Sequence, residues 1–433
     1  MTTPNIIIVG GGAGGLELAT KLGEKLGKKK KASVILVDQT LTHIWKPLLH
    51  EVAAGTINAF HDEQNYFIHA AKHHYEFQLG SLAGLDRNKK LITLSPIIND
   101  DDEIIVAERQ LSYDLLVIAV GSTCNDFDTP GASEHCIYLD SRVKAEHFHQ
   151  RFLEHYIAAH SLTSHNVNDN KLSIVIIGAG ATGVELAAEL HYAAQQYMKL
   201  GLSEITSKNL NITLIEAAPR ILTALPEKIA LQATQELSKI GVSVLTGEQV
   251  VEATASNIRT RSGKNIVSPL KAWCAGIKAP NLLKSLDNLE TNKLNQLVVK
   301  TTLQTTQDDS IFALGDCAMC QLESGIVPPR AQAAHQQASL LIGNIERLLK
   351  KKNLIAFEYI DRGSLISLSK ENSVGTLMGR LIGNVNVNGF LAKLIYRSLY
   401  RSHQSSIHGI YKTAVLIISD LLGRSTGQRT KLH

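Results

Sequence analysis

The chain has 433 residues, of which 44% are hydrophobic and 19% charged, with a net charge of +4. These values are ordinary for a globular protein and exclude a disordered, collagen-like or disulfide-scaffold chain, and the length predicts two to three domains. The five cysteines are odd in number and scattered, which does not suggest a secreted disulfide framework. The first apolar run begins by Ile6 and is typical of a strand, so we expect no signal peptide.

A strand, a glycine turn, a helix and a second strand are predicted at residues 5–9, 10–15, 16–26 and 33–38. The turn fits G-x-G-x-x-G with Gly10, Gly12 and Gly15. The first glycine permits a tight turn, the second lets the backbone approach a pyrophosphate, and the third allows close helix–strand packing. The helix N-terminus offers N–H donors to phosphates, and Asp38 would bind ribose hydroxyls. The pattern predicts a dinucleotide cradle, with a ligand-free glycine turn as the alternative.

The same unit recurs at residues 173–216, with Gly178, Gly180 and Gly183 in the turn and Glu216 at the end of the second strand. Residues 199–210 are expected to be an insertion before that strand. A carboxylate at 216 can accept from a ribose 2′-OH, a bond worth roughly 1.5–3 kcal/mol. A 2′-phosphate would meet like charge there, at about 4 kcal/mol for a 4 Å separation and an effective dielectric of 20. NADH is therefore favoured over NADPH, with Arg220 as the residue that could reverse the preference.

Both glycine turns and several further stretches resemble the type II NADH dehydrogenases, the membrane-peripheral NADH:quinone oxidoreductases that contain FAD, and most closely their proteobacterial respiratory form. The matching stretches are residues 6–15, 45–55, 119–121, 178–189, 273–276, 313–318 and 328–336. The resemblance runs from about residue 5 to the C-terminus. It implies FAD in the first cradle and NADH, as substrate, in the second.

The resemblance also implies which residues contact the cofactors. For FAD they are Gly10, Gly12, Ala13, Gly14, Gly15, Asp38, Pro47, Gly121, Gly315 and Asp316; for NADH they are Gly178, Gly180, Gly183, Glu216, Ala275 and Gly276. Asp316 would bind the ribityl hydroxyls of the flavin, and its alternative role is to cap a following helix. Trp273 would lie near the nicotinamide, and core packing is the alternative.

Three residues match family positions that take part in catalysis. Gln332 and His335 match positions beside the flavin ring at the quinone pocket, and their spacing puts them on one helix face. Glu185 matches a glutamate near nicotinamide and quinone and could relay a proton. The alternatives are a hydrogen-bonded helix histidine for His335 and a first-turn acid that complements the helix dipole for Glu185.

Cys317 and Cys320 form C-x-x-C directly after the second flavin motif. A redox dithiol is one interpretation, but related disulfide reductases carry theirs elsewhere in the chain. We expect buried structural cysteines and no metal site, with thiolate binding of copper as a further alternative.

The C-terminal residues 389–433 carry +6, so residues 1–388 sum to −2. Segment 389–402 has an apolar helix face and, on another face, Lys393, Arg397 and Arg401. This composition suggests an anionic surface as partner and disfavours nucleic acid, for which no motif is visible. The family anchors its C-terminal region to the membrane, in agreement with this pattern. No window is apolar over about 18 residues, so no spanning helix is expected.

These observations predict an α/β fold with two Rossmann-type domains and a C-terminal amphipathic membrane-binding region. The expected domains are residues 1–130 with 285–350 for FAD, 131–284 for NADH, and 351–433 with membrane-anchoring helices. The expected activity is hydride transfer from NADH to FAD and electron transfer to a membrane quinone, ubiquinone first, without proton pumping. We expect a peripheral enzyme on the cytoplasmic face of the cell membrane. The oligomeric state stays open between a monomer and the homodimer that the family often forms. The rival functions are a soluble reductase of a protein or disulfide, and a flavin-bound redox sensor.

Overall fold

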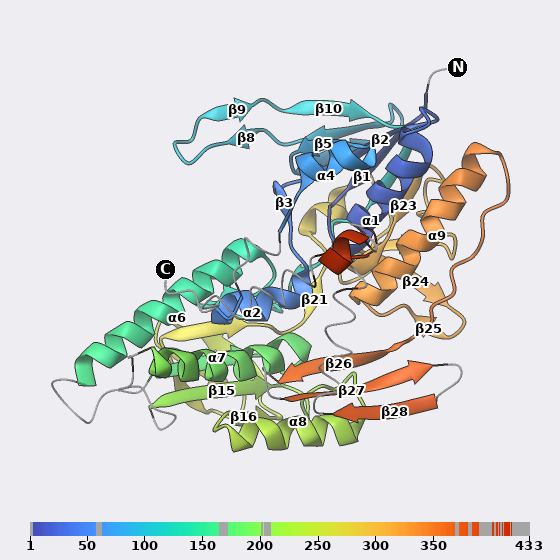
Figure 1. Cartoon of the computed structure of the whole chain (residues 1–433). Coiled ribbons are helices and arrows are strands. Elements are labelled where there is room, and N and C mark those ends of the chain that lie inside the picture. Colours follow the sequence, from blue (N-terminus) through green and yellow to red (C-terminus); the bar gives the residue numbers. More distant parts are fainter. Residues whose placement is uncertain are drawn as a thin grey trace. The chain divides into compact units, whose positions relative to one another are not determined.

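The structure is a computed structural model that describes residues 3–57, 63–163, 172–200, 202, 209–368, 372–379, 383–388, 401, 404, 405, 407, 409, 411–415 and 417. The chain forms two compact units. Unit 1 comprises Met1–Trp45, Glu63–Thr123 and Ile277–Ile360, and unit 2 comprises Lys46–Asp62, Cys124–Gly276 and Asp361–His433. Figure 1 labels the elements of both units.

Unit 1 is built on a five-stranded parallel sheet in the order β23-β11-β1-β2-β5. Its strands are Ile311–Ala313, Leu115–Ile118, Asn5–Val9, Ser33–Asp38 and Glu76–Leu79, in that order. Ile6, Ile7 and Ile8 on the central strand are fully buried, as expected of a parallel strand covered on both faces. The order places the carboxyl ends of β1, β2 and β11 side by side.

Helices and small sheets complete unit 1. Helix α1 (Ala13–Leu22) runs on into a π-helical turn, η1 (Gly23–Gly27), and packs along α9 (Ala331–Leu349). The remaining helices are α4 (Tyr66–His73), η3 (Asn281–Ser285) and η4 (Gly315–Cys317). The small strands are β3 (Thr42–His43), β4 (Gln64–Asn65), β6 (Leu82–Asp86), β7 (Leu91–Leu94), β8 (Ile97–Ile98), β9 (Ile104–Val106), β10 (Arg109–Ser112), β21 (Ile277–Lys278), β22 (Leu297–Val299), β24 (Ala318–Leu322) and β25 (Gly325–Ile326).

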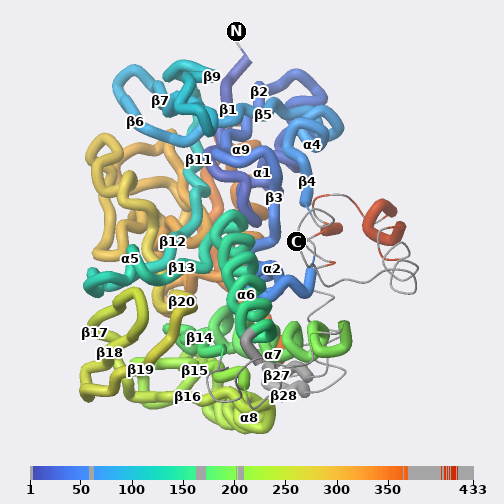
Figure 2. Tube along the Cα trace, turned by 90° about the vertical axis from the view of Figure 1, so that its left-hand side faces the viewer, coloured from blue at the N-terminus to red at the C-terminus, as the bar shows by residue number. Residues whose placement is uncertain are grey.

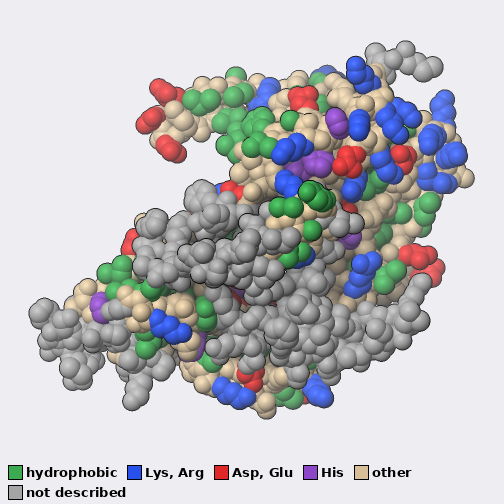
Figure 3. Space-filling model, viewed as in Figure 1, with side chains coloured by type: hydrophobic (Ala, Val, Ile, Leu, Met, Phe, Trp, Pro, Cys, Tyr) green, Lys and Arg blue, Asp and Glu red, His purple; other side chains and the backbone are tan. Residues whose placement is uncertain are grey.

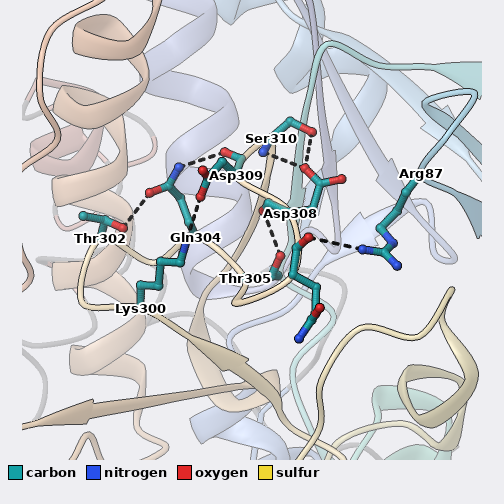
Figure 4. A network of polar contacts seen from close by, with 9 residues as sticks. Arg87, Lys300, Thr302, Gln304, Thr305, Asp308, Asp309 and Ser310 are labelled. Carbon is teal, nitrogen blue, oxygen red and sulfur yellow. Dashed lines mark hydrogen bonds and ion pairs between the residues drawn. The ribbon is translucent and has the colours of Figure 1, made fainter.

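The turn that leads into β23 is held by polar contacts (Figure 4). The Asp308 carboxylate accepts from the Ser310 N–H at 2.8 Å and from its hydroxyl at 2.7 Å. Lys300 forms an ion pair with Asp309 at 2.7 Å, and the Arg87 guanidinium donates to the Gln307 carbonyl. These contacts set the start of the strand whose other end carries Gly315 and Asp316.

Unit 2 repeats the same architecture with a five-stranded parallel sheet in the order β13-β20-β14-β15-β16. Its strands are Ile137–Tyr138, Leu270–Trp273, Leu172–Ile177, Leu210–Glu216 and Ser243–Thr246. Figure 2 shows β14, β15 and β16 layered beside α8. Two parallel sheets with one glycine turn each confirm the predicted α/β fold with two Rossmann-type domains.

The helices of unit 2 whose bounds the structure describes are α2 (Leu49–Ala54), preceded by η2 (Lys46–Leu48), α5 (Ala132–His135), α6 (Arg142–Thr163), α7 (Ala181–Lys199) and α8 (Glu227–Lys239). Its small strands are β17 (Val250–Ala253), β18 (Asn257–Thr260) and β19 (Asn265–Val267), and β12 (Thr123–Cys124) stands where the chain enters the unit. Helix α2 packs against both α6 and α7.

The C-terminal part of unit 2 contains a sheet that was not predicted beside the expected membrane-anchoring helices. Residues 363–388 form an antiparallel sheet of β26 (Gly363–Leu368), β27 (Asn372–Gly379) and β28 (Gly383–Asn388), and β26 packs against α7. These strands are not predicted from the sequence, because the prediction for this region rests on helical periodicity. The predicted amphipathic helix 389–402 lies outside the described residues except for Arg401, as do most residues of the predicted insertion 199–210. Among the helices that the structure describes, none is long and apolar enough to cross a bilayer.

Candidate functional site

The two glycine turns have the same conformation in both units. Gly10 and Gly178 have φ of +105° and +96°, which L side chains rarely adopt. Their N–H groups donate to the second strand of the unit, to Val37 at 2.7 Å and to Ile215 at 2.8 Å. The tight-turn role predicted for the first glycine is therefore confirmed in both copies.

The other motif glycines separate into crowded and open positions. A Cβ on Gly15 would lie 1.9 Å from the Gly10 carbonyl oxygen, and one on Gly183 would lie 2.0 Å from that of Gly178. A Cβ on Gly12 or Gly180 would meet no described atom within 4 Å. The third glycine thus serves close packing, whereas the second presents bare backbone to open space, where a phosphate can approach. Ala13 and Gly14 lie in the first turn of α1, whose N-terminus has no side-chain cap and no acid.

The predicted ribose-binding acids also hold the turns themselves. Asp38 accepts from the Gly11 N–H at 2.6 Å, and Glu216 accepts from the Ala179 N–H at 2.8 Å. The second oxygen of Glu216 accepts from the Ala218 N–H at 2.9 Å. An ionised carboxylate has about four acceptor sites, so both acids retain capacity for a ribose hydroxyl. Ribose binding by either residue stays a prediction.

Two residues that the sequence analysis did not single out cover the first turn. The Tyr66 hydroxyl donates to the Gly11 carbonyl at 2.7 Å, and Nδ1 of His43 lies 2.8 Å from the same oxygen. Both side chains are buried, and burial lowers the pKa of His43. A Cβ on Gly11 would lie 2.3 Å from the Tyr66 hydroxyl, which explains a glycine at a position outside the motif. Neither residue has a local sequence signal, because both come from other strands and helices.

The second flavin motif has support that the sequence did not reveal. Gly315 has φ of +74°, and its N–H donates to Oε1 of the buried Gln337 at 2.7 Å. The Asp316 carboxylate accepts from the Ser122 hydroxyl at 2.8 Å, and Ser122 follows Gly121, whose φ is +71°. The capping alternative for Asp316 is wrong: this residue lies inside η4, and strand β24 follows directly.

In unit 2 the segment after β20 lies against the second cradle. A Cβ on Gly178 would lie 2.5 Å from Cα of Ala275, and Gly276 has φ of +61°. Trp273 is 1% exposed within a core cluster, and its indole N–H donates to the carbonyls of Asn125 and Ala275. Trp273 therefore packs in the core, as the alternative proposed, and also fixes the Ala275 backbone.

Arg220 is engaged away from the ribose position. Its Nη1 donates to the Leu222 carbonyl at 3.0 Å, and its Nη2 donates to the carbonyls of Thr223 at 3.0 Å and Leu225 at 2.9 Å. A guanidinium committed to backbone carbonyls is poorly placed to turn toward a 2′-phosphate. The main objection to a preference for NADH is thereby weakened.

Gln332 and His335 both lie on the first turns of α9 in unit 1. Nδ1 of His335 lies 2.5 Å from the carboxylate of Glu17, a buried residue of α1. The His335 side chain is 38% exposed, so this contact orients a ring that solvent or a ligand can still reach. The roles of both residues at a quinone pocket stay predictions.

Glu185 lies in a buried polar cluster of unit 2. Its Oε1 accepts from the Ser367 N–H at 3.0 Å, and its Oε2 lies 3.5 Å from Nδ1 of His50 on α2. Burial and the nearby carboxylates of Glu51 and Glu189 raise the pKa of Glu185 well above its usual value. The first-turn alternative is wrong, because α7 begins at Ala181 and its first turn contains no acid. A buried carboxyl whose pKa is raised in this way holds its proton more tightly than an exposed one, which suits it to proton transfer. Pro47 lies in η2 of the same unit, and its predicted contact with the flavin stays a prediction.

The C-x-x-C cysteines are both buried thiols. Burial raises the pKa of Cys317 to about 12 and that of Cys320 to about 11. Because the thiolate is the reactive form, these values disfavour a catalytic dithiol. Among the residues that the structure describes, no three His, Cys, Asp or Glu side chains converge as a metal site would require.

Comparison with known proteins agrees with this architecture. Residues 4–338 match the family model described as pyridine nucleotide-disulphide oxidoreductase. The chain is 43% identical to the type II NADH:quinone oxidoreductase of Haemophilus influenzae, over 99% of this chain and 100% of that protein. It is 28% identical to the type II NADH:quinone oxidoreductase of Staphylococcus aureus, over 90% of this chain and 93% of that protein.

Solved structures show the same fold. NDH2 from Plasmodium falciparum in complex with NADH aligns over 100% of both chains with a TM-score of 0.83 and 18% identity. The sulfide:quinone oxidoreductase of Aquifex aeolicus aligns over 96% of this chain and 95% of that chain, with a TM-score of 0.72 and 16% identity.

Proposed function

The chain belongs to the type II NADH:quinone oxidoreductases, and we propose that its unit 1 holds FAD and its unit 2 binds NADH. The observation that carries this proposal is the matched pair of glycine turns, each with an open second glycine before an uncapped helix. Bound in unit 1, FAD would supply the hydride acceptor for NADH and the two-electron donor for quinone. The reaction needs no side-chain nucleophile, in keeping with the buried thiols of the C-x-x-C pair.

The residues of the chain bind and orient the two nucleotides. The amides at the starts of α1 and α7 would bind the two pyrophosphates, and Asp38 and Glu216 would accept from ribose hydroxyls. Asp316, oriented by the Ser122 hydroxyl, would accept from the ribityl chain. In unit 2, Ala275 and Gly276 would line the nicotinamide end, and Glu185 would hold a proton for the reaction. Gln332 and His335 would contact the quinone from α9.

We expect purified protein to oxidise NADH rapidly with a water-soluble ubiquinone analogue, and to need FAD for this activity. The rate of NADH loss is followed by absorbance, with NADPH compared in parallel. Rapid turnover would exclude a slow redox sensor. Flavin reduction by NADH without reoxidation by quinone would overturn the quinone assignment and favour a protein acceptor.

We further propose that residues 389–433 attach the enzyme to the cytoplasmic face of the cell membrane, where ubiquinone is the acceptor. The support is the +6 charge of these residues and the apolar face of segment 389–402. A homodimer is proposed on the resemblance to the family alone.

Replacing Lys393, Arg397 and Arg401 by glutamine is expected to weaken binding to vesicles that contain anionic lipid. Exposed charges act on a surface through Coulomb attraction, so the remaining binding should also fall with added salt. The matched control replaces Lys28, Lys29 and Lys31, which are exposed in unit 1, where Figure 3 shows many Lys and Arg side chains over α1 and α9. The fraction of each variant that sediments with the vesicles measures its binding. Equal losses in the two would contradict an anchor in the C-terminal residues.

A further inference from the structure

His50 lies buried between two carboxylates of unit 2. Its side chain is 1% exposed, with Nδ1 3.5 Å from Oε2 of Glu185 and Nε2 4.0 Å from Oε1 of Glu51. The side chains of Glu51 and Glu185 are 22% and 8% exposed, respectively. The imidazole therefore connects a carboxylate that water reaches with one that water hardly reaches.

The groups around His50 fix which of its ring nitrogens faces each of the two carboxylates. The Pro47 carbonyl accepts a hydrogen bond from the ring, while Nε2 has no hydrogen-bond partner among the described residues. On the other side, the Ser367 N–H holds Oε1 of Glu185, so that Oε2 is the oxygen that faces the ring. Glu189 on α7 also faces Glu185, and His149 on α6 lies against Gly55 at the end of α2.

The proposed reaction requires a proton from water. NADH supplies a hydride, which brings two electrons and one proton, whereas reduction of a quinone to a quinol takes two electrons and two protons. The balanced reaction is NADH + H⁺ + quinone → NAD⁺ + quinol. One proton per turnover must therefore pass from solvent into the protein.

We propose that Glu51 and His50 relay this proton to Glu185. The proposal rests on the function proposed above and deepens it. Glu51 takes a proton from water and passes it to Nε2 of His50, and the proton on Nδ1 passes to Oε2 of Glu185. Glu185 has by then given its own proton to the reaction, and a turn of the imidazole between turnovers brings its protonated nitrogen to face Glu185 again. Glu51 and His50 act through Glu185 and touch no reacting atom.

The electrostatics of the cluster suit this relay. Burial lowers the pKa of His50 to about 4, so the ring is neutral near pH 7, with one nitrogen protonated and the other able to accept. The separations of 3.5 and 4.0 Å exceed those of good hydrogen bonds. Distances of this kind in ligand-free sites shorten when substrate binds, so they are compatible with transfer.

The test compares two electron acceptors in His50→Gln. Quinone takes up protons with its electrons, whereas ferricyanide takes electrons alone. We expect kcat with quinone to fall about 100-fold, the size of a typical general acid–base contribution, with KM for quinone little changed. NADH:ferricyanide activity and flavin content should stay near wild type, which also shows that the variant is folded. The control variant His69→Gln removes an equally buried imidazole, which bonds Tyr75 in unit 1. It should leave both the quinone activity and the ferricyanide activity near wild type.

Glu51→Gln and Glu51→Asp give a second measurement that does not depend on His50. Glu51→Gln should slow quinone reduction, raise its solvent isotope effect and change its pH profile, and Glu51→Asp should restore part of the rate. Wild-type quinone kinetics in both His50→Gln and Glu51→Gln would overturn the relay alone. Parallel loss of ferricyanide and quinone activity would overturn it too, because the residues would then serve structure. A wild-type enzyme that reduced ferricyanide but no quinone would overturn the proposed function, and the relay with it.

Discussion

Gly12→Val is expected to yield a folded protein that no longer retains FAD. The backbone at Gly12 has φ of −66° and ψ of −168°, which a valine can adopt, and a Cβ there would meet no described atom within 4 Å. The open space is where the FAD pyrophosphate is expected, so the added methyl groups should clash with the ligand alone. We expect FAD affinity to fall at least about 100-fold, or about 2.7 kcal/mol. Flavin absorbance after gel filtration measures the loss, and thermal unfolding of the FAD-stripped proteins measures the fold.

Gly180→Val is the matched control, because Gly180 has the same conformation and the same open space in unit 2. This variant should retain flavin that dithionite reduces, while its KM for NADH rises steeply. Gly15→Val should behave differently from both, since its Cβ would lie 1.9 Å from the Gly10 carbonyl oxygen and destabilise the fold. Retention of FAD by Gly12→Val at wild-type affinity would contradict the assignment of the first cradle.

The cradles were predictable because their geometry is local. Within each unit, six residues of the turn and the acid at the end of the next strand define the conformation, and the sequence contains both signals twice. The residues that support the cradles had no such signal. Tyr66 and Gln337 reach Gly11 and Gly315 from distant parts of the chain, and only the folded structure brings them together.

The contacts of the buried cluster around Glu185 also had no local signal in the sequence. The sequence places Glu185 near the start of a helix, which is compatible with a surface acid at the helix N-terminus. Its burial depends on packing of α2 and β26 against α7, and the sequence analysis predicted neither the contact with His50 nor β26. Arg220 is a similar case, because its guanidinium could be assigned to a ligand or to backbone carbonyls until its hydrogen bonds were known.

Glu216→Gln is expected to reduce the preference for NADH over NADPH by up to about 1,000-fold, most of it through better use of NADPH. In the wild type, a 2′-phosphate at 4 Å from the carboxylate would meet a repulsion of about 4 kcal/mol at an effective dielectric of 20. Glutamine removes that charge, and its amide oxygen can keep one of the two bonds that Glu216 accepts from the N–H groups of Ala179 and Ala218. The measurement is kcat/KM for each nucleotide with the same quinone. Arg220→Lys is the matched control: its guanidinium already bonds backbone carbonyls, so this variant should leave the ratio of the two kcat/KM values unchanged. If Arg220→Lys abolished the residual use of NADPH while Glu216→Gln had no effect, nucleotide selection would depend on the arginine and not on the carboxylate.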